Sequence, residues 1–338
     1  LSSSGLNYEA SKDGNGSYRW TQQVMATLQS KFGFTSFRPN QLEAINCTLA
    51  QQDVFCVMPT GAGKSLLYQL PALMANGVTL VVSPLLSLMQ DQVTWLEGMD
   101  IHATLLNSEL SKSQTNEVYS MMLDPSSTLK LLYVTPEKIA QSKQFMNKVQ
   151  KMYDANRLAR IVVDEAHCCS QWGHDFRPDY TKLGKLKNLF KVPLLAVTAT
   201  ATQRVEADCK QLLEVRKWTV FRNSFNRPNL HYSVALKKTN FDQSVQQIFD
   251  FIQANGHTNN CGIVYCLARK ETEEVSAALE SLGIACSFYH AQMDISFRSK
   301  SQQMWMEGKV KVMCATAAFG LGINKPDVRF VVHHTISK

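Results

Sequence analysis

The amino-acid sequence predicts an α/β protein built around two parallel sheets, and two observations lead to that prediction. Short apolar runs alternate with longer amphipathic stretches along most of the chain, which is the pattern of buried parallel strands joined by crossover helices. This pattern occurs twice, and a polar, proline-containing stretch at 224–232 separates the two series. With 338 residues, the chain also exceeds the roughly 100–200 residues of one ordinary domain.

The strand candidates define the two domains. In the first series the apolar runs lie at 53–58, 78–83, 129–135, 159–165 and 192–200. In the second series they lie at 261–266, 285–290, 310–315 and 328–333. We therefore expect a first domain over 18–222 and a second over 223–338, with the junction near 215–230. Residues 1–17 are rich in Ser, Gly and Asn without apolar periodicity, which predicts a flexible lead-in.

Composition excludes several classes of protein. The chain is 45% hydrophobic and 19% charged, which is typical of a packed globular protein. Its longest apolar runs, such as 78–86, are shorter than the roughly 18 residues of a membrane-spanning helix. Nine cysteines without a CxxC pair or zinc-finger spacing indicate buried thiols in a reducing compartment, with no zinc site in this segment. The net charge of +7 fits a nucleic-acid partner and an ordinary solvated surface equally well.

The stretch MPTGAGKS at 58–65 predicts a phosphate-binding loop, because it follows a strand candidate and precedes a helix candidate. Small residues allow backbone N–H groups to close around phosphates, and a Lys and a Ser can then contact the β and γ phosphates and Mg²⁺. Met58 stands where the strict pattern has Gly. We assign the loop to Thr60, Gly61, Ala62 and Gly63, the phosphate contact to Lys64 and the Mg²⁺ contact to Ser65.

The second motif, DEAH at 164–167, is acidic and ends the strand candidate ARIVV. We expect Asp164 to hold Mg²⁺ and Glu165 to orient and deprotonate the attacking water, while His167 connects this site to its neighbours. The stretch TATAT at 198–202 ends the next strand candidate. It is either a sensor of the phosphate state or an ordinary turn rich in hydroxyls.

In this order, the motifs resemble the RecQ family of superfamily 2 DNA helicases, from about residue 32 to the end of the chain. The most distinctive stretch is SQWGHDFRPDY at 170–180, and the Bloom-type branch is the most similar. Further matching stretches are FGFTSFRPNQ, SPLLSLMQDQ, YVTPEK, SFNRPNL and FGLGINKPDVRFVVHH. The resemblance implies two tandem RecA-like P-loop domains, the second incomplete, that use ATP and Mg²⁺.

The resemblance also implies roles for particular residues. Phe34, Arg38 and Gln41 would recognise adenine, which agrees with the ability of Gln to pair with the adenine edge. The aromatic-rich loop would sense single-stranded DNA and relay its presence to the ATP site; its residues are Trp172, His174, Phe176 and Arg177. Alternatively, its aromatic side chains pack in the core. Ser83, Thr135 and Glu137 lie where strand candidates end and would add DNA contacts.

The expected function is that of an ATP-dependent DNA helicase, which translocates on single-stranded DNA and unwinds duplexes, forks or junctions in repair, recombination and replication in the nucleus. In the RecQ family, the arginine-finger motif and a zinc-binding domain follow the position of Lys338. We therefore expect weak turnover from this segment alone. Two alternatives remain open: a catalytically silent DNA-binding fragment, and an RNA helicase built on the same motor.

Overall fold

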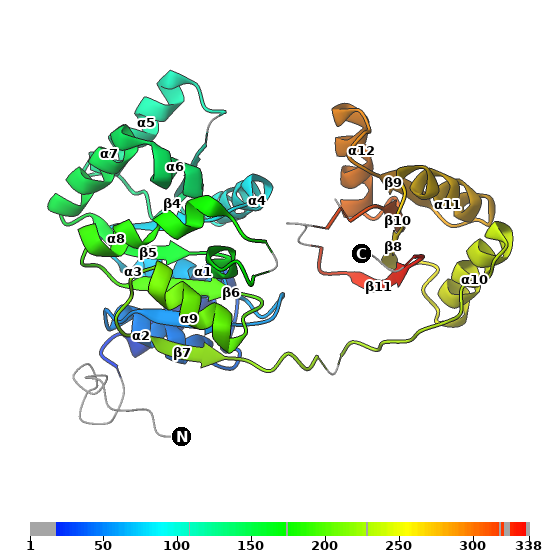
Figure 1. Ribbon diagram of the computed structural model, residues 1–338, viewed down its shortest axis with the longest axis horizontal. Coiled ribbons are helices and arrows are strands. Elements are labelled where there is room, and N and C mark those ends of the chain that lie inside the picture. Colours follow the sequence, from blue (N-terminus) through cyan, green and yellow to red (C-terminus); the bar gives the residue numbers. More distant parts are fainter. Residues whose placement is uncertain are drawn as a thin grey trace. The chain divides into compact units, whose positions relative to one another are not determined.

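The computed structural model describes residues 18–107, 109–173, 175–227, 229–317, 319–320 and 325–335. The lead-in expected at 1–17 lies outside the described residues. The chain forms two compact units, Leu1–Pro228 and Asn229–Lys338, and each has its own sheet (Figure 1). The strand at 219–222 belongs to the sheet of unit 1.

Unit 1 contains a seven-stranded sheet in the order β3-β4-β2-β5-β6-β1-β7, and its described pairings are all parallel. Its central strands are buried along their whole length or nearly so, as expected for a sheet covered on both faces. The strands are β1 (Val54–Val57), β2 (Val78–Val82), β3 (Ala103–Leu106), β4 (Leu131–Val134), β5 (Leu158–Val163), β6 (Leu194–Thr198) and β7 (Thr219–Arg222).

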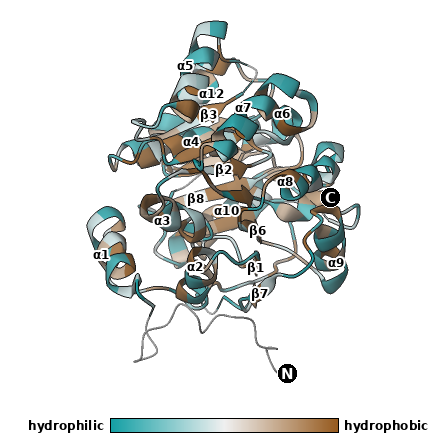
Figure 2. Ribbon diagram, turned by 90° about the vertical axis from the view of Figure 1, so that its left-hand side faces the viewer, coloured by the Kyte–Doolittle hydropathy of each residue, from teal (hydrophilic) through white to brown (hydrophobic). Residues whose placement is uncertain are grey.

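Helices cover both faces of this sheet and bury a separate apolar core on each. One core includes residues of α1 (Thr21–Phe32), α2 (Gln41–Leu49), α3 (Leu66–Met74) and α4 (Leu86–Glu97). The other includes residues of α5 (Lys112–Leu123), α6 (Pro136–Gln141), α7 (Lys143–Asp154), α8 (Gly184–Leu189) and α9 (Gln203–Leu212). In Figure 2 the strands are largely brown, whereas the helices carry teal segments. Alternating apolar runs and amphipathic stretches thus form a three-layer unit.

Unit 2 has the same kind of architecture around a four-stranded parallel sheet in the order β11-β8-β10-β9. The strands are β8 (Cys261–Tyr265), β9 (Cys286–Tyr289), β10 (Val312–Ala315) and β11 (Val328–His333). One core packs α10 (Phe241–Ala254) and α11 (Arg269–Ser281) on the sheet, and the other packs Trp305 of α12 (Ile295–Met306). Within the described ranges, no helix has the length and apolar character needed to cross a bilayer.

Every predicted strand is present, whereas two strands were not predicted. The missed strands are β3 and β7, which form the two edges of the first sheet. Both have half-buried positions, so neither shows a continuous apolar run. The run at 159–165 also ends earlier than expected. Strand β5 stops at Val163, and the two carboxylates follow it in a turn.

Candidate active site

The loop that follows β1 has the geometry of a phosphate-binding turn. Gly61 and Gly63 have φ angles of 79° and 82°, which side chains other than glycine rarely adopt. The side chain of Lys64 turns back, and its Nζ lies 3.4 Å from the carbonyl oxygen of Met58. Ser65 directly precedes α3 and makes no side-chain capping bond, so its hydroxyl remains available to a ligand. The sequence Met58–Ser65 therefore folds as predicted, between a strand and a helix.

Gln41 supports this loop from the start of α2. The residue is only 3% exposed. Its Nε2 donates to the carbonyl oxygens of Ala62 at 3.2 Å and Gly63 at 3.1 Å, and its Oε1 accepts from the backbone N–H of Arg38. Arg38 also donates from Nη1 to the carbonyl of Gly61. Both ends of the Gln41 amide are therefore engaged, and recognition of adenine would require it to leave the loop.

Asp164 and Glu165 lie just beyond the carboxyl end of β5 in very different electrostatic environments. Burial, together with the neighbouring charge of Glu165, raises the pKa of Asp164 to about 7. Burial also acts to raise the pKa of Glu165, but a hydrogen bond with His167 and the charge of Lys64 hold it below its usual value. Asp164 accepts from the Ser83 hydroxyl at 3.4 Å and from the backbone N–H of Glu165 at 3.0 Å.

The donors at this edge fit Mg²⁺. Asp164 is buried, and Oε2 of Glu165 is also shielded from solvent, with Nδ1 of His167 3.3 Å away. Two desolvated carboxylates side by side repel each other, so a divalent cation would relieve that repulsion. Oxygen donors from carboxylates and hydroxyls are also the ligands that Mg²⁺ prefers. Asp164 and the hydroxyl of Ser65 are thus chemically suited to the ion.

His167 connects the acidic motif to the stretch TATAT. Its Nδ1 lies 2.8 Å from Oγ1 of Thr198, the last residue of β6, and 3.3 Å from Oε2 of Glu165. The hydroxyl of Thr198 donates to the carbonyl of Thr200 at 3.1 Å. Because a hydroxyl has one proton, its oxygen then accepts from Nδ1–H of His167. The two motifs therefore form one hydrogen-bonded unit.

The segment Ser170–Tyr180, here called the aromatic loop, is fixed to the acidic motif at several points. The hydroxyl of Tyr180 is fully buried and donates to the backbone carbonyl of Asp164 at 2.8 Å. A Cβ on Gly173 would lie 2.2 Å from the carbonyl oxygen of His167, so the loop folds closely over that residue. Arg177 donates from Nη1 to the carbonyl of Pro84 at 2.8 Å.

Helix α9 holds the other side of the aromatic loop. Ser170 donates to Asp208 at 2.6 Å, and the guanidinium carbon of Arg204 lies 3.5 Å from the ring centroid of Trp172. Trp172 is nevertheless 61% exposed, which excludes the alternative that it packs in the core. Phe176 is half-buried. His174 lies outside the described residues.

The other predicted DNA contacts differ in accessibility. Ser83 is 1% exposed and bonded to Asp164, so the expectation that it contacts DNA is corrected: it belongs to the acidic site. Thr135 caps α6 by accepting from the backbone N–H of Lys138 at 3.4 Å. Glu137 is exposed, as is Phe34 at 49%. Ser83 does lie at the carboxyl end of a strand, where parallel sheets bind their ligands, but its partner there is the carboxylate of Asp164.

Three functional candidates escaped the sequence analysis. Tyr180, Arg204 and Asp208 act through contacts between residues distant in the sequence. Tyr180 stands at the end of a recognised motif, and that position was the only available signal. Arg204 and Asp208 lie in an amphipathic helix, where nothing distinguishes them from solvated charges.

Comparison with known proteins identifies the family of the chain. Residues 38–208 match the DEAD/DEAH box helicase family, and residues 243–338 match the helicase conserved C-terminal domain. The ATP-dependent DNA helicase Q1 of Rattus norvegicus is 48% identical over 95% of this chain and 52% of its own length. The ATP-dependent DNA helicase Q-like 2 of Arabidopsis thaliana is 48% identical over 95% of this chain and 46% of its own length. The chain therefore spans about half the length of these relatives.

A solved structure shows the same fold. The DUF1998 helicase MrfA bound to DNA and AMPPNP has a TM-score of 0.72 and 17% identity, covering 93% of this chain and 46% of that chain. The names of both relatives specify ATP dependence, so ATP, usually with Mg²⁺, is the cofactor of this family. From the family match and these relatives we conclude that the chain belongs to the DEAD/DEAH box helicase family and, within it, to the RecQ type.

Proposed function

We propose that this chain is the motor core of an ATP-dependent DNA helicase that moves on single-stranded DNA and separates duplexes. The observation that carries the proposal is the attachment of the aromatic loop to the ATP site. Tyr180 bonds to Asp164, and Gly173 packs on His167. An exposed Trp172 on that loop offers a stacking surface for a base, worth roughly 1–3 kcal/mol and tolerant of sequence.

In this proposal, Lys64 and the backbone of Thr60–Gly63 bind the phosphates of ATP. Ser65 and Asp164 hold Mg²⁺, which when bound neutralises negative charge on the β and γ phosphates. Glu165 accepts the proton of the attacking water, and its lowered pKa keeps the carboxylate ionised and therefore free to accept that proton at neutral pH. His167 and Thr198 keep Glu165 in place.

DNA-stimulated ATP hydrolysis tests this proposal. We expect single-stranded DNA to raise the hydrolysis rate of this chain, and Lys64→Ala to abolish hydrolysis with or without DNA, because the substitution removes the contact with the transferred phosphate. Lys112→Ala is the matched control, since Lys112 is exposed at the start of α5. Unchanged hydrolysis in Lys64→Ala would refute the assigned site.

The same assay distinguishes the alternatives. A larger stimulation by RNA than by DNA of equal length would make the chain an RNA helicase and leave the ATP site unaffected. DNA binding without any hydrolysis would identify a silent binding fragment.

Preference for forks or junctions is proposed from the resemblance alone, and binding to forked and plain duplexes of equal length measures it. A nuclear location is proposed on the same basis, and imaging of the tagged protein checks it.

The role of Gln41 can be separated from its support of the phosphate loop. If Gln41 leaves the loop to pair with adenine, Gln41→Ala should weaken ATP binding and bring the affinities for ATP and GTP close together. If it acts only through Ala62 and Gly63, the two affinities should fall by the same factor. Phe34→Ala should then weaken both nucleotides alike, because stacking does not distinguish purines.

A further inference from the structure

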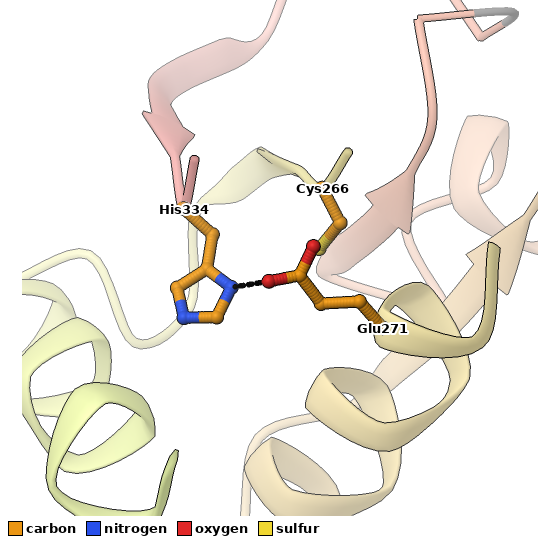
Figure 3. A group of neighbouring side chains, drawn as sticks. All are labelled: Cys266, Glu271 and His334. Atoms are coloured by element: carbon orange, nitrogen blue, oxygen red, sulfur yellow. Dashed lines mark ion pairs between the residues drawn. The ribbon is translucent and has the colours of Figure 1, made fainter. Parts of the chain in front are cut away.

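Unit 2 contains a cluster of three side chains that belongs to none of the sites above. Cys266 follows β8, His334 follows β11 and Glu271 lies in the first turn of α11. Strands β8 and β11 are parallel neighbours in which Tyr265 pairs with His333, so the next residues of both strands meet at one edge. Figure 3 shows the three side chains pointing toward one another. Their ligand atoms all lie within 4.8 Å of one another.

The histidine of this cluster has one committed ring nitrogen and one nitrogen that faces the other two side chains. His334 is 6% exposed, and its Nε2 lies 2.8 Å from the hydroxyl of Ser244 on α10. Its Nδ1 lies 2.9 Å from Oε1 of Glu271 but makes no hydrogen bond of good geometry with any described residue. A ring held through one nitrogen with the other directed at a cysteine and a carboxylate is typical of a metal-binding histidine.

We propose that Cys266, Glu271 and His334 form a binding site for Zn²⁺ or a divalent cation of the same borderline-soft class. A sulfur, an imidazole nitrogen and a carboxylate oxygen make up a zinc-type donor set, and three protein ligands leave one position for water. The proposal departs from the expectation of no zinc in this segment, which considered only spacing along the chain. Here the ligands come from two strands and a helix, which sequence spacing does not reveal.

A cation that binds here would have to displace one proton from the cluster. Burial, more than any neighbouring charge, holds the pKa of His334 below its usual value, so its imidazole is neutral near pH 7. Burial raises the pKa of Cys266 to about 12, so the thiol keeps its proton until a cation arrives. On binding, one S–H bond breaks, one sulfur–metal bond forms and the proton passes to solvent.

Two neighbouring side chains contact the carboxylate of Glu271 and would have to move away when a cation binds. Nζ of Lys237 and Oγ1 of Thr335 each lie 3.4 Å from Oε1 of Glu271. Lys237 is exposed and can extend into solvent. The other oxygen, Oε2, accepts from the backbone N–H of Leu267 at 3.1 Å, which keeps the carboxylate oriented while Oε1 turns to the cation. The cation would join β8, β11 and α11 at the edge where β11 ends.

Titration of this chain with Co²⁺ after removal of metals with a chelator tests the proposal. We expect one equivalent to bind with a thiolate-to-cobalt absorption band, and one equivalent of Zn²⁺ to displace it. Cys266→Ser should abolish the band, and His334→Gln should weaken binding about tenfold or more. Cys261→Ser is the matched control, because Cys261 is a buried cysteine at the opposite end of β8. It should keep the band.

The proposal is wrong if the wild-type chain shows no thiolate band, if Cys266→Ser keeps it, or if Cys261→Ser loses it to the same extent. A measurement on the wild-type protein avoids dependence on folding of the variants. Zn²⁺ should protect Cys266 from alkylation, as mapped by peptide mass spectrometry, and should leave the modification of Cys261 unchanged. Equal alkylation of Cys266 with and without Zn²⁺ would overturn the proposal. Ser244→Ala should weaken Zn²⁺ binding about tenfold, because it frees the ring that Ser244 orients.

Discussion

The ionised carboxylate of Asp164 lowers the stability of the folded protein. Burial and the charge of Glu165 raise its pKa to about 7, so above that pH the folded protein contains an ionised carboxylate in an unfavourable environment. In the unfolded chain the carboxyl group is hydrated, so its ionisation is not penalised in this way. The proposed role of Asp164 in binding Mg²⁺ accounts for a residue that is unfavourable for stability.

Asp164→Asn should therefore stabilise the nucleotide-free chain while abolishing ATP hydrolysis. The amide keeps the bond from the backbone N–H of Glu165 and can donate to the hydroxyl of Ser83, with no charge to desolvate. We expect a gain in unfolding free energy of about 1 kcal/mol at pH 8 with EDTA present, measured by urea denaturation. Asp250→Asn, on the exposed side of α10, is the control and should change it very little. A marked loss of stability in Asp164→Asn would contradict this account.

Single residues also show the limits of sequence reasoning. Ser83 and Thr135 each end a predicted strand, which placed both on a ligand-facing edge, yet one bonds to Asp164 and the other caps a helix. Tyr180 was missed because its hydroxyl donates to a backbone carbonyl, that of Asp164. Every residue has a backbone carbonyl, so the sequence does not mark the acceptor. Local sequence therefore identified the edge of the sheet but not the partner of each side chain.

At the scale of elements, strands with continuous apolar runs were predictable and edge strands were not. Central strands such as β1 and β2 are buried at every residue, so burial is recorded directly in their composition. Edge strands β3 and β7 are short and partly exposed, and their pairing depends on a neighbouring strand that the local sequence does not reveal. The aromatic loop was likewise only partly predictable. Its sequence is recognisable, but residues far away in the sequence hold it in place.

Gly173→Ala tests the packing of the aromatic loop on the acidic motif. The added Cβ would lie 2.2 Å from the carbonyl of His167 and 3.1 Å from that of Ser170, so the loop must move. We expect DNA stimulation of ATP hydrolysis to fall several-fold while nucleotide binding without DNA is retained. Gly98→Ala is the control, because its Cβ would meet only ordinary contacts at 3.5 Å. Normal stimulation in Gly173→Ala would show that this close packing is unimportant.

At the scale of the whole molecule, each unit has its own sheet and cores, and the proposed sites lie at the carboxyl ends of parallel strands in both. In unit 1 that edge carries the ATP site and the aromatic loop. In unit 2 it carries the cluster of Cys266, Glu271 and His334. This placement follows the general rule for open parallel sheets. The sequence predicted the first site through its motifs, whereas the second depends on the register of β8 and β11.

The central claim is that the aromatic loop links single-stranded DNA to the ATP site, and linked binding tests it most directly. The measurement is the affinity of the wild-type chain for a non-hydrolysable ATP analogue with Mg²⁺, with and without saturating single-stranded DNA. We expect DNA to change that affinity by about fivefold or more, the lower end of typical linkage. Trp172→Ala and Tyr180→Phe should each retain nucleotide binding and lose most of the change, whereas Trp95→Ala, an exposed tryptophan on α4, should keep it. Equal affinity with and without DNA in the wild type, or a full change in Trp172→Ala, would contradict the account.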